Sequence, residues 1–333
     1  MKRLINQEVN VVTDMIDGFL KLSRGQFKKV PGVNAIMKTN PKKKVSVIVG
    51  GGTGLDPWPI GYVGEGLADG AAVGNIFCAP PAKSILELTR QLPHEDGVIY
   101  VVTNHAGDVL NFELVSELAG MEGIRTRQIY INDDITSADK SQKEERRGIG
   151  GVALLTKLAG AITESGKGLD EAATILEEAK NNIGTFSVTA GPSYSPVTGK
   201  KSFELEEGKM EYGMGFNGET GIKREDISTA DEIAGTLMEG LLKDLDVNRG
   251  DNVVLWMNGY SITSQIELSI MAGKCCDILR EREIGLADIQ IERLYVTPGA
   301  AGLSLSMLKM NQVFEQYYKV PAYSPFFKIM WKE

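Results

Sequence analysis

Apolar positions along the chain follow two alternating periods, one typical of helices and one typical of strands. One face of a helix near the start of the chain carries Val12, Met15, Ile16, Phe19 and Leu20. Short β-branched or apolar runs at residues 45–49, 98–102 and 128–131 predict buried strands, and helical patterns separate or follow these runs. Strands that alternate with helices are typical of an α/β protein with a mostly parallel sheet.

The composition of the chain changes near residue 183. Residues 186–221 are rich in glycine, serine, proline and threonine, and a helical pattern at 230–242 and a strand at 253–256 follow. We therefore expect two α/β domains, residues 1–183 and 184–333, both with mostly parallel sheets and crossover helices.

Composition and charge exclude several classes of protein. Of the 333 residues, 42% are hydrophobic and 24% are charged, which excludes wholesale disorder, and the net charge of −8 disfavours nucleic acid or an anionic membrane as the main partner. We expect a cytoplasmic protein, because no apolar run reaches transmembrane length and acidic residues interrupt the region where a signal peptide would be apolar. Three cysteines and two histidines provide neither a disulfide framework nor a zinc site, so no metal ligands are predicted.

Two loops that follow predicted strands could carry chemistry. Residues 50–54 read Gly-Gly-Gly-Thr-Gly, and glycines there would let backbone N–H groups approach a ligand, although a tight turn is an equal alternative. The loop fits neither the dinucleotide fingerprint nor the P-loop. Asp108 follows the strand at 98–102, where its carboxylate could act as a general base or, alternatively, cap a helix that starts at Val109.

Other polar residues have a structural reading beside a functional one. Asp133 and Asp134 could hold a cation, but acidic pairs at strand ends more often form turns or caps. His105 is more simply a hydrogen-bonded structural histidine, and Cys275 and Cys276 are expected to pack in a helix. Asn217 lies in a glycine-dense segment that would bring its amide to a defined place, or that is only a structural loop.

The chain resembles the dihydroxyacetone kinase family, specifically its substrate-binding K subunit, along essentially its full length. The motifs that carry the resemblance are MKRLIN at the start, IVGGGTGLDP at 48–57, GYVGEG at 61–66, NHAGDVLNF at 104–112, Asp133-Asp134, RRG at 146–148, PVTGKKSFEL at 196–205 and MEYGMGFNGETGI at 210–222. The resemblance implies a homodimer of two-domain α/β protomers that binds short ketoses, typically dihydroxyacetone, near the domain interface.

The same resemblance implies a division of labour between subunits. A family histidine forms a covalent hemiaminal with the ketone, and a second histidine assists an aspartate as acid or base. The phosphoryl group comes from an L subunit that carries ADP or ATP with Mg²⁺, so no cofactor is expected in this chain. In bacterial members a phosphohistidine protein of the phosphotransferase system regenerates the ATP. Some relatives are ligand-sensing coactivators of a transcription factor.

This sequence departs from the family at the residues that perform the chemistry. Asn217 stands where the family has its hemiaminal histidine, Leu55 replaces the histidine of the glycine loop, Thr103 replaces a common lysine, and the aspartate is kept as Asp108. An amide nitrogen does not add to a ketone, and a leucine side chain exchanges no proton. The substrate-binding residues implied by the resemblance are Gly51, Gly52, Thr53, Gly54, Leu55, Thr103, Asp108 and Asn217, with Asp108 as the remaining catalytic group.

Three functions are compatible with these substitutions. The first is a kinase subunit that holds a hydroxyketone or small polyol non-covalently for an L-type partner, because phosphoryl transfer depends mainly on positioning and on charges near the nucleotide. The second is a ligand-sensing coactivator without kinase activity, and the third is a scaffold with a vestigial site. The sequence favours the first by a narrow margin and leaves open whether the chain is an enzyme.

Overall fold

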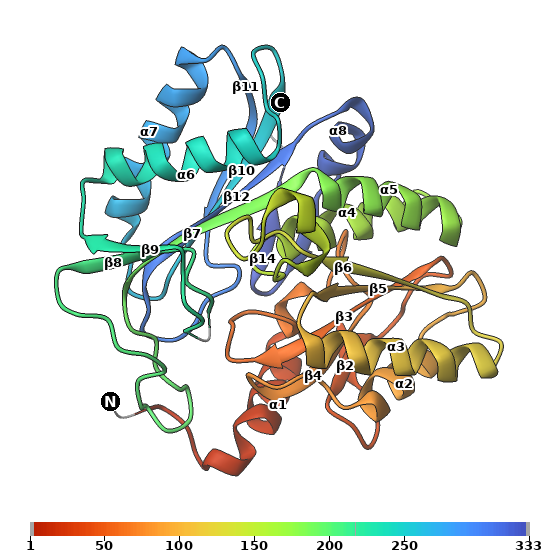
Figure 1. Ribbon diagram of the computed structural model, residues 1–333. Coiled ribbons are helices and arrows are strands. Elements are labelled where there is room, and N and C mark those ends of the chain that lie inside the picture. Colours follow the sequence, from red (N-terminus) through yellow and green to blue (C-terminus); the bar gives the residue numbers. More distant parts are fainter. Residues whose placement is uncertain (1–2, 217, 331–333) are drawn as a thin grey trace. The chain divides into compact units, whose positions relative to one another are not determined.

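The chain folds into two compact units, each built around a six-stranded sheet (Figure 1). The structure is a computed structural model that describes residues 3–216 and 218–330. Within this part of the chain, the amino-terminal unit comprises residues 3–131, 155–180 and 313–330. The carboxy-terminal unit comprises residues 132–154, 181–216 and 218–312.

These units differ from the single division into 1–183 and 184–333 that the sequence suggested. Residues after 131 join the carboxy-terminal unit, where the backbone N–H of Thr185 donates to the carbonyl of Asp133 over 2.7 Å. The last described residues return to the amino-terminal unit, where the N–H of Tyr323 donates to the carbonyl of Glu65 over 2.9 Å. Such contacts join residues far apart in sequence, and no change in composition marks them.

The sheet of the amino-terminal unit has the strand order β1-β2-β4-β3-β5-β6. Strands β4, β3, β5 and β6 are parallel, while β1 and β2 form an antiparallel edge. The strands are β1 (Phe27–Lys29), β2 (Ala35–Lys38), β3 (Ser46–Thr53), β4 (Gly70–Ile76), β5 (Val98–Thr103) and β6 (Thr126–Ile131).

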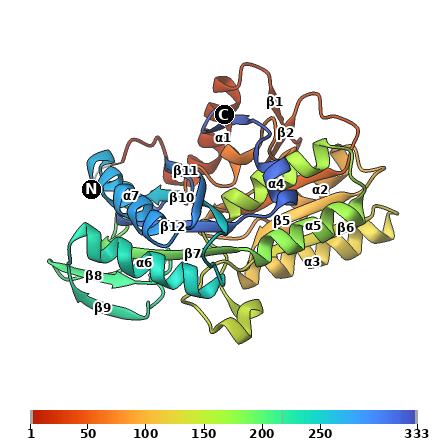
Figure 2. The same ribbon diagram turned by 90° about the horizontal axis from the view of Figure 1, so that it is seen from above.

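Helices cover this sheet because its central strands are apolar on both faces. Val98, Tyr100 and Val102 of β5 pack in one cluster with α2 (Ala82–Gln91) and α3 (Ala106–Met121). The alternate residues of β5 are equally buried, as expected for a strand inside a parallel sheet. Figure 2 shows α3 running beside the strands that it covers.

The remaining elements of the amino-terminal unit come from distant parts of the chain. The short hairpin of β13 and β14 pairs with the segment after η2, and Phe326 beside it packs on Phe19 of α1. These elements are η1 (Glu8–Asn10), α1 (Val11–Leu22), η2 (Ile60–Tyr62), β13 (Ala322–Ser324) and β14 (Phe327–Ile329). Three further helices begin or end at the unit boundaries: α4 (Val152–Glu164), α5 (Leu169–Asn181) and α8 (Gln312–Tyr318).

The sheet of the carboxy-terminal unit has the order β11-β10-β12-β7-β8-β9. Its helices α6 (Ala230–Asp244) and α7 (Gln265–Glu281) pack in one core cluster with β7, β10 and β12. Thr229 and Ser264 begin these two helices through capping boxes, each with a glutamate three residues on. The other elements are η3 (Lys140–Glu145), β7 (Ile183–Gly191), β8 (Lys209–Tyr212), β9 (Lys223–Asp226), β10 (Asn252–Gly259), β11 (Gly285–Glu292) and β12 (Ala301–Lys309).

The α/β class is confirmed, but the second sheet is not mostly parallel. Only β10 and β11 pair in parallel among its described strands, and the other neighbours are antiparallel. The reason is that only α7 provides a helical crossover between neighbouring strands, whereas loops join β7 to β8, β8 to β9 and β11 to β12.

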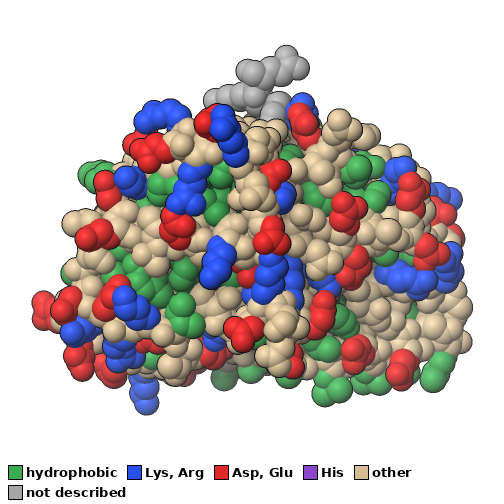
Figure 3. All heavy atoms as spheres, turned by 45° about the horizontal axis from the view of Figure 1, so that its top comes forward, with side chains coloured by type: hydrophobic (Ala, Val, Ile, Leu, Met, Phe, Trp, Pro, Cys, Tyr) green, Lys and Arg blue, Asp and Glu red, His purple; other side chains and the backbone are tan. Residues whose placement is uncertain are grey.

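Charged side chains of both signs are interspersed on the face shown in Figure 3, so the net charge of −8 does not gather there as one acidic field. Among the described residues, no helix is both long and apolar enough to cross a bilayer.

Candidate functional site

The candidate site lies at the carboxyl ends of β3 and β5 in the amino-terminal unit. The two strands are neighbours in register, with Gly50 opposite Val102, so the loops that follow them start side by side. The chain then leaves β3 toward β4 and leaves β5 toward β6, on opposite sides of this pair. Ligands of open α/β sheets bind at such switch points.

The glycine loop is closely packed from behind, which explains its glycines. A side chain at Gly51 would place its Cβ 2.3 Å from Nε1 of Trp58, and one at Gly52 would lie 2.7 Å from the backbone nitrogen of Cys78. Gly54 has a φ of +94°, a region that side chains disfavour. The surrounding side chains and backbone therefore fix the conformation of the loop. A tight turn and a ligand-binding loop, the two alternatives for residues 50–54, are both compatible with this packing.

Thr53 and Leu55 complete this loop with side chains that face inward. Thr53 is 1% exposed, and its hydroxyl donates to the carbonyl of Gly74 over 3.2 Å. Leu55 is also buried, so the place where the family has a histidine is apolar here. The Thr53 hydroxyl anchors the loop, and Leu55 adds no proton donor or acceptor to it.

Asp108 projects from the first turn of α3, just after β5. The interpretation of Asp108 as a helix cap is wrong, because α3 begins at Ala106 and His105 is the N-cap residue. The side chain is buried, and its Oδ2 accepts a long 3.5 Å hydrogen bond from the hydroxyl of Thr103. Its Oδ1 is buried and finds no hydrogen-bond partner among the described residues.

Burial also changes the acidity of this carboxyl group. Loss of hydration raises the pKa of Asp108 to about 7 and outweighs the hydrogen bond from Thr103, which lowers it. A carboxyl group with a pKa near neutrality can accept a proton from a ligand hydroxyl and return it at physiological pH. An unpartnered buried oxygen also favours a ligand that donates a hydrogen bond to it.

The structure thus brings together most of the residues that the sequence singled out. Gly51, Gly52 and Thr53 form the carboxyl end of β3, and Gly54 and Leu55 follow it directly. Thr103 ends β5, and Asp108 lies in the first turn of α3. Asn217 lies outside the described residues.

The other acidic candidates have structural partners. Asp133 accepts hydrogen bonds from the backbone N–H groups of Ile149 and Gly151, both at 2.7 Å, and burial raises its pKa to about 6. Asp134 pairs with Arg147 over 2.8 Å. Among the residues that the structure describes, no group of three or more histidine, cysteine, aspartate or glutamate side chains could hold a metal ion.

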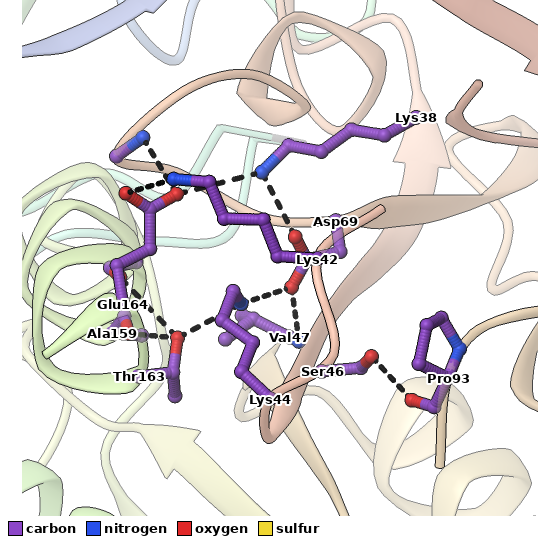
Figure 4. Close-up of polar contacts among 12 residues, drawn as sticks. Lys38, Lys42, Lys44, Ser46, Val47, Asp69, Pro93, Ala159, Thr163 and Glu164 are labelled. Carbon is purple, nitrogen blue, oxygen red and sulfur yellow. Dashed lines mark hydrogen bonds and ion pairs between the residues drawn. The ribbon is translucent and has the colours of Figure 1, made fainter. Parts of the chain in front are cut away.

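A buried ion cluster lies at the opposite, amino-terminal ends of β3 and β4 (Figure 4). Asp69 binds Lys44 over 2.5 Å and Lys38 over 2.8 Å, and it also accepts the backbone N–H of Val47 over 2.9 Å. Burial alone would raise the pKa of Asp69, but the two lysines outweigh burial and lower this pKa. A 3.1 Å hydrogen bond from Lys44 to Thr163 connects the amino-terminal ends of these strands to α4.

Sequence reasoning missed the residues that shape the site from behind. Phe112 of α3 would meet a side chain at Gly50, and Trp58 would meet one at Gly51. The segment after β4 passes Gly52, where the N–H of Phe77 donates to the carbonyl of Thr53 over 2.9 Å. The consecutive glycines were the only signal that other atoms approach this closely.

Comparison with known proteins gives matches along nearly the whole chain. The Dak1 domain family matches residues 17–326. The chain is 31% identical to the dihydroxyacetone-binding subunit DhaK of PTS-dependent dihydroxyacetone kinase 2 from Listeria innocua, covering 99% of this chain and 100% of that subunit. It is 33% identical to a D-erythrulose kinase of Mycolicibacterium smegmatis, covering 98% of this chain but 57% of that longer protein.

A solved structure agrees with these relatives. The dihydroxyacetone kinase operon co-activator Dha-DhaQ is 28% identical and superposes with a TM-score of 0.86, covering 93% of this chain and 96% of that one. The fold, the site at β3 and β5 and the full-length matches together establish that the chain belongs to the dihydroxyacetone kinase family, as a member of the Dak1 domain type that includes the dihydroxyacetone-binding K subunits.

Proposed function

We propose that this protein is a K-type binding subunit that holds a short hydroxyketone non-covalently at the loops after β3 and β5. An L-type partner that carries ADP or ATP with Mg²⁺ then phosphorylates the bound ligand. The ligand class comes from the relatives, whose names include dihydroxyacetone-binding subunits and erythrulose kinases. No cofactor is assigned to this chain.

The observation that carries the proposal is the unpartnered carboxylate oxygen of Asp108. This oxygen is buried in the helix that follows β5, the sheet neighbour of the β3 strand that carries the glycines, and the pKa of its carboxyl group is raised to about 7. A ligand hydroxyl that donates to Oδ1 would satisfy the buried oxygen. In the ionised form Asp108 would also draw the proton from that hydroxyl as the oxygen attacks the phosphoryl group.

The binding is proposed to be non-covalent because of the residues at positions 55 and 217. Asn217 has no nucleophilic nitrogen, and Leu55 has no proton to exchange. General acid–base assistance is worth roughly 10²–10⁴ in rate. With Asp108 alone, phosphorylation of dihydroxyacetone is expected to be slower than in relatives that keep both histidines.

A second candidate function is ligand sensing without phosphoryl transfer. The operon co-activator Dha-DhaQ has the same fold and covers nearly the same length, and the absence of both family histidines fits a protein that binds without catalysing. In this case the ligand would bind at the same loops, and the partner would be a transcription regulator. The homodimer and the cytoplasmic location stay predictions under either function.

Calorimetric titration tests the binding claim. Dihydroxyacetone, erythrulose and hydroxyacetone are titrated into the wild type, into Asp108→Asn, and into Glu117→Gln as a control for the loss of one charge from an exposed site on the same helix. We expect saturable binding to the wild type and to Glu117→Gln, with about tenfold weaker binding to Asp108→Asn because a hydrogen bond to a charged group is lost. Equal binding to all three proteins would contradict the assigned role of Asp108.

A transfer assay separates the two functions. The protein, an L-type subunit, ATP with Mg²⁺ and the best-binding ketone are combined, and the phosphorylated ketone is measured by mass spectrometry. Product that requires all components supports the kinase subunit. Ligand binding without product, together with ligand-dependent capture of a regulator, would favour the coactivator.

A further inference from the structure

A second polar pocket of the amino-terminal unit lies outside the proposed ketone site. It has a volume of about 420 Å³ and lies between the β1–β2 turn, the end of β4 and the start of α2. Its polar lining consists of Lys29, Asn34, Asn75, Lys83 and Ser84, and no acidic side chain of the described chain lines it. The two lysines give it a positive charge inside a protein that carries a net charge of −8.

The start of α2 supplies further donors to this pocket. The N-cap residue of the ten-residue helix is Pro81, which has no side chain to accept from the first turn. Within the described part of the chain, the amides of Ala82 and Lys83 have no hydrogen-bond acceptor, whereas the amide of Ser84 already donates to Pro81. Free N–H groups and the helix dipole make such a terminus favourable for an anion.

Ser84 gives an independent indication of a ligand. The residue is only 4% exposed and lines the pocket, yet its hydroxyl has no hydrogen-bond partner among the described residues. Because the residue is almost fully buried but lines the pocket, its hydroxyl is available for a hydrogen bond to a ligand there.

The two lysines are available to a ligand. Lys83 is exposed and has no ion-pair partner within the described residues. The ammonium group of Lys29 lies 3.9 Å from the carboxylate of Asp17 in α1, a long and solvent-exposed ion pair, and Asp17 does not line the pocket. Both ammonium groups can therefore turn to an anion at little cost.

We propose that this pocket binds a phosphate group, either free inorganic phosphate or the phosphate of a small monoester. A phosphate has enough oxygens to accept from two ammonium groups, the Ser84 hydroxyl and helix amides at once. Asn34 and Asn75 line the remaining wall and can donate to the same oxygens. The inference stands on these residues and is independent of the proposed ketone binding.

Calorimetry at low ionic strength tests the proposal with inorganic phosphate and glycerol 3-phosphate as probes. The variants are Lys83→Gln, Ser84→Ala and, as a matched control, Lys28→Gln, which removes a lysine of the same strand as Lys29 that does not line the pocket. We expect binding to weaken about tenfold in Lys83→Gln and about fivefold in Ser84→Ala. Lys28→Gln should bind as the wild type does.

The outcomes distinguish the sources of the phosphate group. Tighter binding of glycerol 3-phosphate than of phosphate assigns the pocket to a monoester, whereas equal binding assigns it to the phosphate group alone. Asp108→Asn should leave both affinities unchanged, which separates this pocket from the ketone site. The proposal is overturned if neither probe binds the folded wild type, or if Lys28→Gln weakens binding as much as Lys83→Gln.

Discussion

Asp108→Asn is expected to make the ligand-free protein more stable at pH 8 and, at the same time, to weaken its binding of the ketone. The carboxyl group of Asp108 has an ordinary pKa of 3.8, and burial in the folded protein raises it to about 7. A raised pKa means that the folded state binds the proton more tightly than the unfolded state does. The stability associated with the protonated group is fully present below pH 4 and is lost as the pH rises through 7.

The size of this effect follows from the shift. A change of about three pKa units corresponds to about 4 kcal/mol at 1.36 kcal/mol per unit, which is an upper limit because ionisation draws water toward the side chain. Asparagine has nearly the same shape and never ionises. Between pH 5 and pH 8 the titration covers only about two of these pKa units, so the variant should gain about 1–3 kcal/mol relative to the wild type over this interval.

Urea unfolding at pH 5 and pH 8 measures this difference, with Glu117→Gln as the control for the loss of an exposed carboxylate. The difference between Asp108→Asn and wild type should grow with pH, whereas that between Glu117→Gln and wild type should stay nearly constant. If Asp108→Asn gains no stability between the two pH values, the carboxyl group is not buried as the structure has it, and its raised pKa is refuted.

Three other changes have defined outcomes. Asp69→Asn leaves two lysines without their buried partner and should lower the free energy of unfolding in urea by about 3–5 kcal/mol. Lys42→Gln, at the exposed edge of the same cluster, should lower it by less than about 1 kcal/mol. Equal losses would contradict the importance assigned to the buried pair. Gly51→Ala should lower stability by about 1–3 kcal/mol and weaken ketone binding, since the new methyl group meets the indole nitrogen of Trp58 at 2.3 Å. An unchanged ketone affinity and an unchanged free energy of unfolding would show that the loop is not held as described. Carbon-13 NMR of dihydroxyacetone labelled at its carbonyl should show no tetrahedral adduct with the wild type. The double variant Leu55→His, Asn217→His should form such an adduct. An adduct with the wild type would contradict non-covalent binding.

The sequence predicted the elements that position the site because they are local and strongly patterned. The β-branched run before Gly50 and the apolar run before Thr103 identified β3 and β5, and glycines after a strand indicated close approach by other atoms. The sequence could not reveal which atoms these were, since Trp58 and Phe112 reach the glycines only through tertiary packing.

The sequence predicted less about strands at the edges of the sheets and about segments that return to a unit after the chain has left it. No strand was predicted at residues 285–292, which form β11 at one edge of the second sheet. The residues of β11 are mostly half-buried, so they lack the alternation that marks a strand with one buried face. The helix start at Ala106 was also missed, because no side chain caps α3 and the sequence therefore carries no cap signal.

The central claim is that this protein binds a short hydroxyketone through Asp108, although it lacks both family histidines. Titration of dihydroxyacetone and erythrulose into wild type and Asp108→Asn at pH 7 tests it most directly. We expect saturable binding of at least one ketone to the wild type, and markedly weaker binding to a variant that unfolds no more easily than the wild type. Absence of binding to the wild type, or equal binding to both proteins, would contradict it.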